Sequence, residues 1–120
     1  MESSAQCPGL SLDKGIMQFG GNKDLYFTIL GYYVTDTYTL LDSLGEFVAI
    51  NEDNLSEYAK IVHGIKGSSR SVYAEGVGDT AEKLESAAKN DDLEYVLANN
   101  RSFIEEILLL VHNIEDMLAS

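Results

Sequence analysis

The chain has 120 residues, about the length of one domain, and 45% of them are hydrophobic, which is enough to form a core. No apolar run approaches the roughly 18 residues of a membrane span, and the N-terminus lacks the basic start and apolar stretch of a secretory signal. A single cysteine, Cys7, excludes an internal disulfide, and we expect it to be a thiol in an irregular tail. These features predict a cytoplasmic domain without membrane contact.

The charge balance limits the classes of partner that the chain can bind. Twenty acidic and eight basic residues give a net charge of −12, and such a surface repels nucleic acid and anionic membranes. High net acidity commonly serves solubility alone. Three of the eight basic residues nevertheless fall within eleven positions around one of the two histidines, His63; they are Lys60, Lys66 and Arg70.

The first part of the chain predicts a lead-in and two helices. Residues 1–11 form an irregular lead-in or linker, and a short helix follows with Asp13 as its N-cap and Gly20-Gly21 as its end. Asn22 is the expected N-cap of a long helix over 23–44. Strand-forming residues are frequent there, but apolar positions recur at three- and four-residue steps, which indicates a helix: Leu25, Ile29, Tyr33, Thr37, Leu40, Leu41 and Leu44.

Two further helices follow a connection over 45–53. Asn54 or Asp53 is the expected N-cap of a helix over 55–73. Its inner face is Leu55, Tyr58, Ala59, Val62, Ile65, Ser69 and Val72. Glycines at 76 and 78 are expected to loosen the chain before a fourth helix that ends near Asn90, with an inner stripe of Val77, Ala81, Leu84 and Ala88.

The last helix is expected to begin at Asp91-Asp92, because negative charge suits a helix N-terminus. Its apolar seam is Leu93, Leu97, Ile104, Ile107, Val111, Ile114 and Leu118. Four amphipathic helices with short loops predict an all-α fold, in which residues 12–120 form an antiparallel up-down-up-down four-helix bundle capped by the short first helix. Core or groove positions are expected for Tyr26, Tyr32, Tyr33 and Tyr38.

The surroundings of His63 indicate a chemical role. Lys60, Lys66 and Arg70 lie three or seven residues away and share its helix face, so they would supply positive potential to a bound anion. Gly67 costs a helix about 1 kcal/mol relative to alanine, but it would let a partner approach the imidazole. A neutral imidazole is a nucleophile, so the pattern favours a histidine that accepts a phosphoryl group. The alternative is an exposed histidine without a role, beside solvated lysines and a glycine that serves helix packing.

The segment His63-Gly64-Ile65-Lys66-Gly67-Ser68-Ser69 resembles the signature of histidine-containing phosphotransfer (HPt) domains. The segment from Phe19 to Tyr26 resembles the start of their second helix, and Leu84-Glu85 resembles a Leu-Glu pair that follows the histidine helix. The resemblance covers roughly residues 12 to 118. One departure is Tyr73-Ala74, where family members often carry Gly-Ala, and this tyrosine is expected to affect helix packing or the partner surface.

The resemblance implies that His63 is phosphorylated, that Lys66 stabilises the phosphoryl group and that Gly67 gives the partner access. Ser69 is expected to be a packing or hydrogen-bonding residue, and Glu85 and Lys89 are candidates for a polar side chain near the phosphohistidine. The module would not be an enzyme and would need no cofactor or metal of its own. Its expected partners are response-regulator receiver domains, which would bring the phospho-aspartate and Mg²⁺, and a hybrid sensor histidine kinase in the same or another chain.

Two other functions fit a helical bundle less well. One is a protein-interaction domain that has kept the HPt fold and lost phosphotransfer, although His63, Lys66 and Gly67 are all intact. The other is a bundle enzyme or metal carrier, which two histidines and the lack of a Glu-x-x-His pair disfavour. The second histidine, His112, has no such neighbours and is expected to be structural or superficial.

Overall fold

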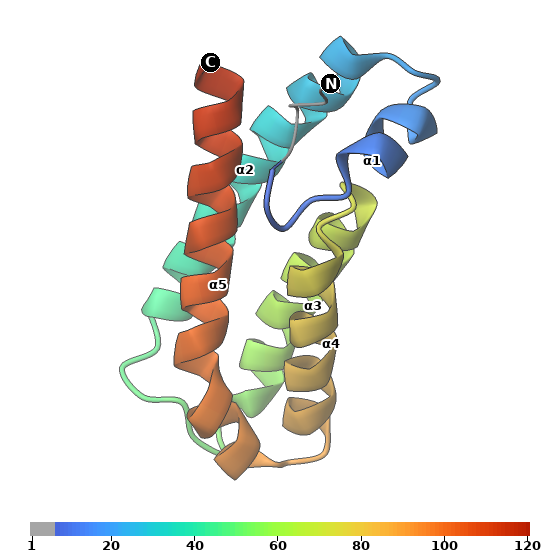
Figure 1. The fold of residues 1–120 in the computed structure, drawn as a ribbon. Helices are drawn as coiled ribbons and strands as arrows, with labels where there is room; N and C mark the ends of the chain where they lie inside the picture. Colours follow the sequence, from blue (N-terminus) through green and yellow to red (C-terminus); the bar gives the residue numbers. More distant parts are fainter. Residues whose placement is uncertain (1–6) are drawn as a thin grey trace.

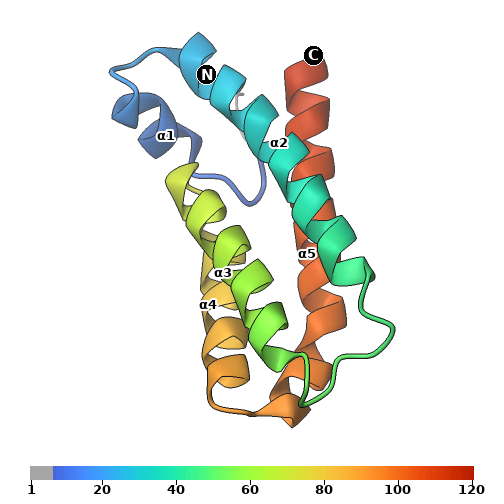
Figure 2. The same cartoon turned by 180° about the vertical axis from the view of Figure 1, so that it is seen from behind.

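The computed structural model describes residues 7–120, and within them it contains helices and no strand. The helices are α1 (Leu12–Gln18), α2 (Lys23–Gly45), α3 (Leu55–Ser71), α4 (Glu75–Lys89) and α5 (Leu93–Ala119). The four long helices run alternately up and down, and α1 lies across the end of the bundle where α3 stops and α4 starts (Figures 1 and 2). The predicted all-α bundle with a short N-terminal helix is therefore confirmed. No helix in this part of the chain is long and apolar enough to cross a membrane.

Side-chain caps and glycines set the helix boundaries. The Asn22 side chain accepts a hydrogen bond from the Leu25 amide at 3.0 Å, so the predicted cap of α2 is confirmed. Gly20 and Gly21 have φ angles of 68° and 82°, left-handed values that glycine adopts without steric cost, and they follow the end of α1 as expected. The predicted N-cap of α1 is wrong, because Ser11 occupies that position and Asp13 lies in the first turn.

Three buried tyrosines tie α2 and α3 into the core through their hydroxyl groups. Tyr26 donates to the carbonyl of Val72 at 2.7 Å, which holds α2 against the end of α3. Tyr33 Oη and Ser69 Oγ lie 2.7 Å apart in the interior, and Tyr58 on α3 donates to Asn100 Oδ1 on α5 at 2.7 Å. Because a buried hydroxyl is costly without a partner, these bonds fix the rotation of α3 about its axis.

Four apolar residues lie differently from expectation. Leu25 is 43% exposed because the next residue, Tyr26, takes the inward position of the first turn of α2. Leu97 is 55% exposed because the core-facing positions of α5 pass through Val96 instead. Tyr32 is 65% exposed rather than in the core, and Cys7, expected in a tail, is buried against the core cluster.

The connection between α3 and α4 turns on Tyr73, the residue at which the sequence departs from the Gly-Ala of the resemblance. Its φ of 66° is left-handed, which explains why glycine suits the position. The tyrosine instead holds α1: its hydroxyl donates to Gln18 Oε1 at 3.1 Å, and its carbonyl accepts from the Ser11 amide at 3.0 Å. Residue 73 therefore anchors the N-terminal helix on the bundle.

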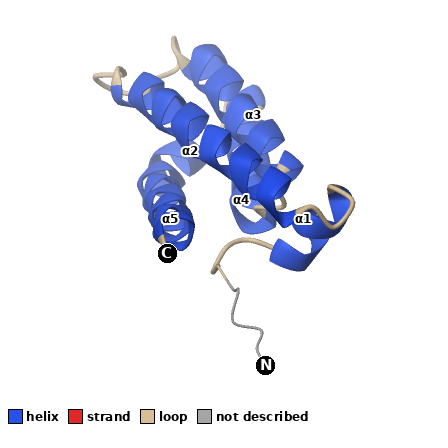
Figure 3. Cartoon of the chain, turned by 90° about the horizontal axis from the view of Figure 1, so that it is seen from above, coloured by secondary structure: helices blue, strands red, loops and turns tan. Residues whose placement is uncertain are grey.

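The expectation that the glycines at 76 and 78 loosen the chain is wrong, because both lie inside α4. A Cβ atom on Gly78 would lie 2.7 Å from Arg70 Cγ, so the missing side chain leaves room for the stem of Arg70 to cross α4. Close packing between α3 and α4 thus depends on small residues at their contact. Viewed along the bundle, α3 and α4 lie side by side, with α2 and α5 completing it (Figure 3).

Gly15 has a comparable packing role on α1, which predicts the effect of Gly15→Ala. The added methyl would overlap the Tyr26 ring, so we expect the free energy of unfolding to fall by about 1–3 kcal/mol. The control is Gly31→Ala inside α2, where a Cβ meets nothing within 4 Å. That change should stabilise the protein by about 0.5–1 kcal/mol. Urea denaturation of both variants checks this, and equal shifts would contradict the packing role of Gly15.

Candidate functional site

Helix α3 divides into a buried face and an open face. Tyr58, Val62 and Ile65 on the inner face are fully or almost fully buried. On the other side the His63 side chain is 64% exposed, and a Cβ atom on Gly67 would meet nothing within 4 Å. Gly67, one turn after the histidine, therefore leaves open space above the helix. It does not lie in a close contact between helices, which the alternative interpretation required.

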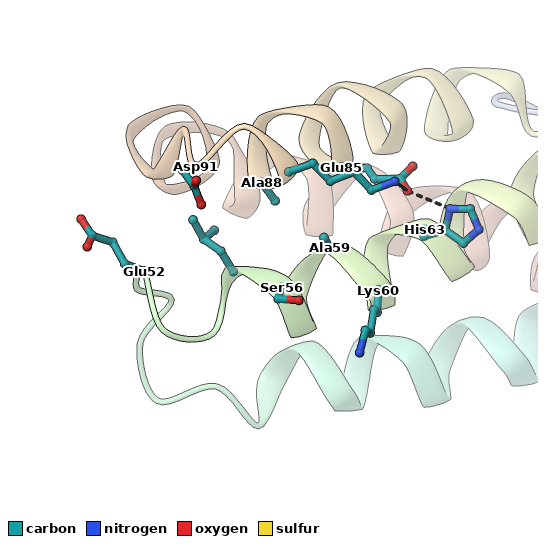
Figure 4. A pocket seen from close by; sticks show the side chains of 10 residues that line it. Glu52, Ser56, Ala59, Lys60, His63, Glu85, Ala88 and Asp91 are labelled. Atoms are coloured by element: carbon teal, nitrogen blue, oxygen red, sulfur yellow. Dashed lines mark hydrogen bonds and ion pairs between the residues drawn. The ribbon is translucent and has the colours of Figure 1, made fainter.

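A single buried carboxylate on α4 gathers the polar side chains of this face. Glu85, whose side chain is 5% exposed, places Oε2 at 2.8 Å from His63 Nδ1 and at 2.9 Å from Lys89 Nζ. Its other oxygen lies 2.6 Å from Lys66 Nζ. Figure 4 shows the carboxylate reaching across from α4 to the imidazole ring. We call this set, His63, Lys66, Glu85 and Lys89, the Glu85 cluster.

The cluster keeps Glu85 ionised. Burial by itself would raise its pKa, but hydrogen bonds from Lys66, Lys89 and His63 outweigh that effect and lower the pKa to about 2. An ionised carboxylate only accepts hydrogen bonds, so the ring nitrogen facing it must be the donor. The neutral imidazole consequently carries its proton on Nδ1 and has its lone pair on Nε2.

The remaining candidates lie around the cluster. Arg70 does not join it, because two carboxylates of α4 hold its guanidinium: Glu82 at 2.9 Å and Asp79 at 3.2 Å. Ser69 is buried on the inner face and pairs with Tyr33, and Lys60 is exposed one turn before His63.

Beside the histidine lies a groove between α3 and α4 that the sequence did not indicate. Some of its lining residues were not candidates: Glu52, Ser56 and Asp91. Only the folded chain places them in the same groove as His63, and no motif marks them. His112 is exposed on α5, and the described part of the chain contains no group of three or more His, Cys, Asp or Glu residues arranged for a metal ion.

The fold and the cluster together define a helical bundle with one exposed, carboxylate-oriented histidine on its third helix. The family model described as Hpt domain matches residues 28–119, and the chain belongs to that family. No curated protein and no solved structure matches the chain. Hpt domains are phosphotransfer modules rather than catalysts, so the general role of this domain is histidine phosphotransfer in a phosphorelay.

The lowered pKa of Glu85 predicts how acid affects stability. Its value of about 2 in the folded protein lies below the ordinary 4.5, so the carboxylate stabilises the fold fully above about pH 4.5. That contribution is lost as the pH falls from 4.5 towards 2. Glu85→Gln should lower the free energy of unfolding at pH 7 by on the order of 1–3 kcal/mol.

Urea denaturation of wild type and Glu85→Gln between pH 7 and pH 3 measures this difference. It should shrink steadily below about pH 4.5. The control is Glu82→Gln, which removes an exposed carboxylate one turn earlier on α4 and should cost about 1 kcal/mol or less. A Glu85→Gln effect that does not change with pH would contradict an ionised Glu85.

Proposed function

We propose that His63 accepts a phosphoryl group from the phospho-aspartate of one receiver domain and passes it to the aspartate of another. The observation that carries this proposal is the hydrogen bond between His63 Nδ1 and buried Glu85. It leaves the Nε2 lone pair as the free nucleophile on a side chain that is 64% exposed. A structural histidine would not need to be both accessible and oriented by an ionised carboxylate.

The transfer is a displacement at phosphorus. The Nε2 lone pair forms a bond to phosphorus while the bond from phosphorus to the aspartyl oxygen breaks, and aspartate leaves as a carboxylate. The ring then carries a positive charge with its proton still on Nδ1, facing Glu85 at 2.8 Å. Glu85 stabilises that imidazolium as it forms, in the way that a buried carboxylate supports a catalytic histidine. The reverse reaction on a second receiver uses the same contacts.

We assign the lysines of the Glu85 cluster to the phosphoryl oxygens. Lys66 and Lys89 each reach the carboxylate that holds His63, and Lys89 is 65% exposed and free to turn outwards. Lys60, one turn before His63, adds positive potential at the margin. The charge of Arg70 is already paired by Asp79 and Glu82, so we assign it to joining α3 and α4.

Other requirements of the reaction fall to the partner. Phosphoryl transfer depends on metal neutralisation of the phosphate oxygens, and we propose that the receiver domain brings Mg²⁺ together with its aspartate. The domain needs no cofactor of its own in this scheme. A hybrid sensor histidine kinase, in the same or another chain, is the expected source of the phosphoryl group, and the setting is the cytoplasm.

Phosphoryl uptake tests the proposal. The domain is incubated with a receiver, a small phosphodonor and Mg²⁺, and we expect an acid-labile, base-stable phosphate on the wild type. His63→Gln should remove it completely because the nucleophile is lost, whereas the control His112→Gln should be labelled like the wild type. Binding of several receivers without any label would instead support an interaction domain that has lost phosphotransfer.

The Nδ1 hydrogen bond also predicts the position of the phosphoryl group. Nitrogen-15 and phosphorus-31 NMR of the phosphorylated domain should show phosphate on Nε2, because Nδ1 is turned towards Glu85. Phosphate on Nδ1 would contradict the orientation on which the proposal rests.

The Gly67→Ala variant separates the stability of α3 from the access of a receiver to His63. Alanine should stabilise α3 by about 1 kcal/mol because it suits a helix better than glycine, and its methyl group meets nothing inside the domain. The same methyl lies on the open face beside His63, so transfer from a receiver should slow by about tenfold, the equivalent of about 1.4 kcal/mol. Parallel transfer kinetics and urea denaturation measure both effects. Unchanged transfer would show that the partner does not approach over Gly67.

A further inference from the structure

The groove beside His63 has a volume of about 570 Å³ and runs between the first half of α3 and the last half of α4. Its floor consists of apolar side chains that are themselves buried, Leu55, Ala59 and Ala88. Two of these are alanines, so the groove is open because the side chains are small. It continues directly to His63, which is one of its lining residues.

The two ends of the groove carry opposite charges. Lys60, Lys89 and the paired carboxylate of Glu85 line it near the histidine, which leaves this end net positive, whereas Glu52 and Asp91 line its other end. Figure 4 shows both residues on the side of the groove away from the imidazole, on the loops that precede α3 and follow α4. The cationic end suits the anionic active site of a phosphorylated receiver, but Glu52 and Asp91 take no part in the phosphoryl chemistry.

We infer that this groove selects among receiver domains, by holding an apolar side chain and a basic side chain of a loop next to the receiver's phospho-aspartate. The apolar side chain covers the alanine floor, and the Lys or Arg pairs with Glu52 and Asp91. The inference rests on the proposed function, because His63 lines the groove and the occupant we assign is the receiver docked at that histidine. It adds the chemistry that a preferred receiver must present.

Helix geometry sets the spacing of that chemistry. Ser56, on the groove edge, lies seven residues before His63, which is about 10 Å along the helix at 1.5 Å per residue. The basic group of the receiver must therefore lie about 10 Å or more from its phosphorylated aspartate. Complementary charges at such a rim improve encounter and discriminate between partners more than they raise affinity.

The test compares matched receivers. We first select a receiver that phosphorylates the wild-type chain and has Lys or Arg in the loop next to its phospho-aspartate. Its matched partner in the comparison is the same receiver with Gln in place of that Lys or Arg. We expect the wild type to prefer the basic receiver by about three- to tenfold in kcat/KM, the range for two exposed ion pairs. Glu52→Gln with Asp91→Asn should reduce the preference to about one, and asparagine tolerates the φ of 57° at position 91.

Two further variants make the test specific. Glu105→Gln with Asp116→Asn removes the same charge from exposed positions on α5 and should leave the preference unchanged. Ser56→Trp, at an exposed position on the groove edge, should slow transfer from both receivers by about tenfold because it fills the groove, the equivalent of about 1.4 kcal/mol of docking energy.

The outcomes separate the two proposals. A wild type that uses both receivers equally, a preference that survives the double change at residues 52 and 91, or transfer that is unaffected by Ser56→Trp would overturn the groove as a selective site. Phosphorylation of His63 would still stand in each of these cases. If no receiver phosphorylates the wild type at all, the proposed function falls and the groove inference falls with it.

Discussion

One buried charge organises the functional face of this domain. Glu85 lies almost fully out of solvent on α4, and an ion in that position is costly unless it is paired and hydrogen-bonded. Its partners come from both helices: His63 and Lys66 from α3 and Lys89 from α4. The same contacts that make the carboxylate tolerable also orient the imidazole and gather two ammonium groups beside it. Stability and chemistry are therefore coupled through a single side chain.

The geometry of that cluster depends on how α3 is held. The hydrogen bond between Tyr33 and Ser69 and the one from Tyr58 to Asn100 hold α3 on its buried side, against α2 and α5. Once the rotation of α3 is set, the position of His63 on the opposite face follows. Ser69, part of the motif around the histidine, holds the helix that presents the ring through its bond with Tyr33 and is not a member of the Glu85 cluster.

The helices could be predicted from the sequence because apolar periodicity and capping residues are local signals. The histidine with its glycine and lysine could also be predicted, since all three lie within one short segment of α3. Contacts between side chains on different helices could not be predicted from these local signals. The guanidinium of Arg70 was expected at the phosphoryl site, yet Glu82 and Asp79 on another helix compete for it, and Gly78 provides the space that lets it cross.

The errors in the predicted core have a related cause. On a helix the apolar stripe is wide, and a neighbouring residue can take the inward position, as Tyr26 does in place of Leu25 and Val96 in place of Leu97. The expected position of Cys7 was wrong for a different reason: the segment before α1 has no apolar periodicity, but it still covers the core. Tertiary contacts, which leave no mark on local spacing, decide such cases.

The chemistry that we propose for His63 is too general to select one partner. A nucleophilic nitrogen, a supporting carboxylate and two lysines would serve any phospho-aspartate that reached them, so selectivity has to come from surfaces that differ between domains. On a chain with a net charge of −12, carboxylates are abundant, and most of those in the described residues are exposed. Glu52 and Asp91 differ because they line one end of a groove that has buried alanines in its floor and His63 at its other end. Their distance from the ring would allow partner choice to change without altering the transfer reaction.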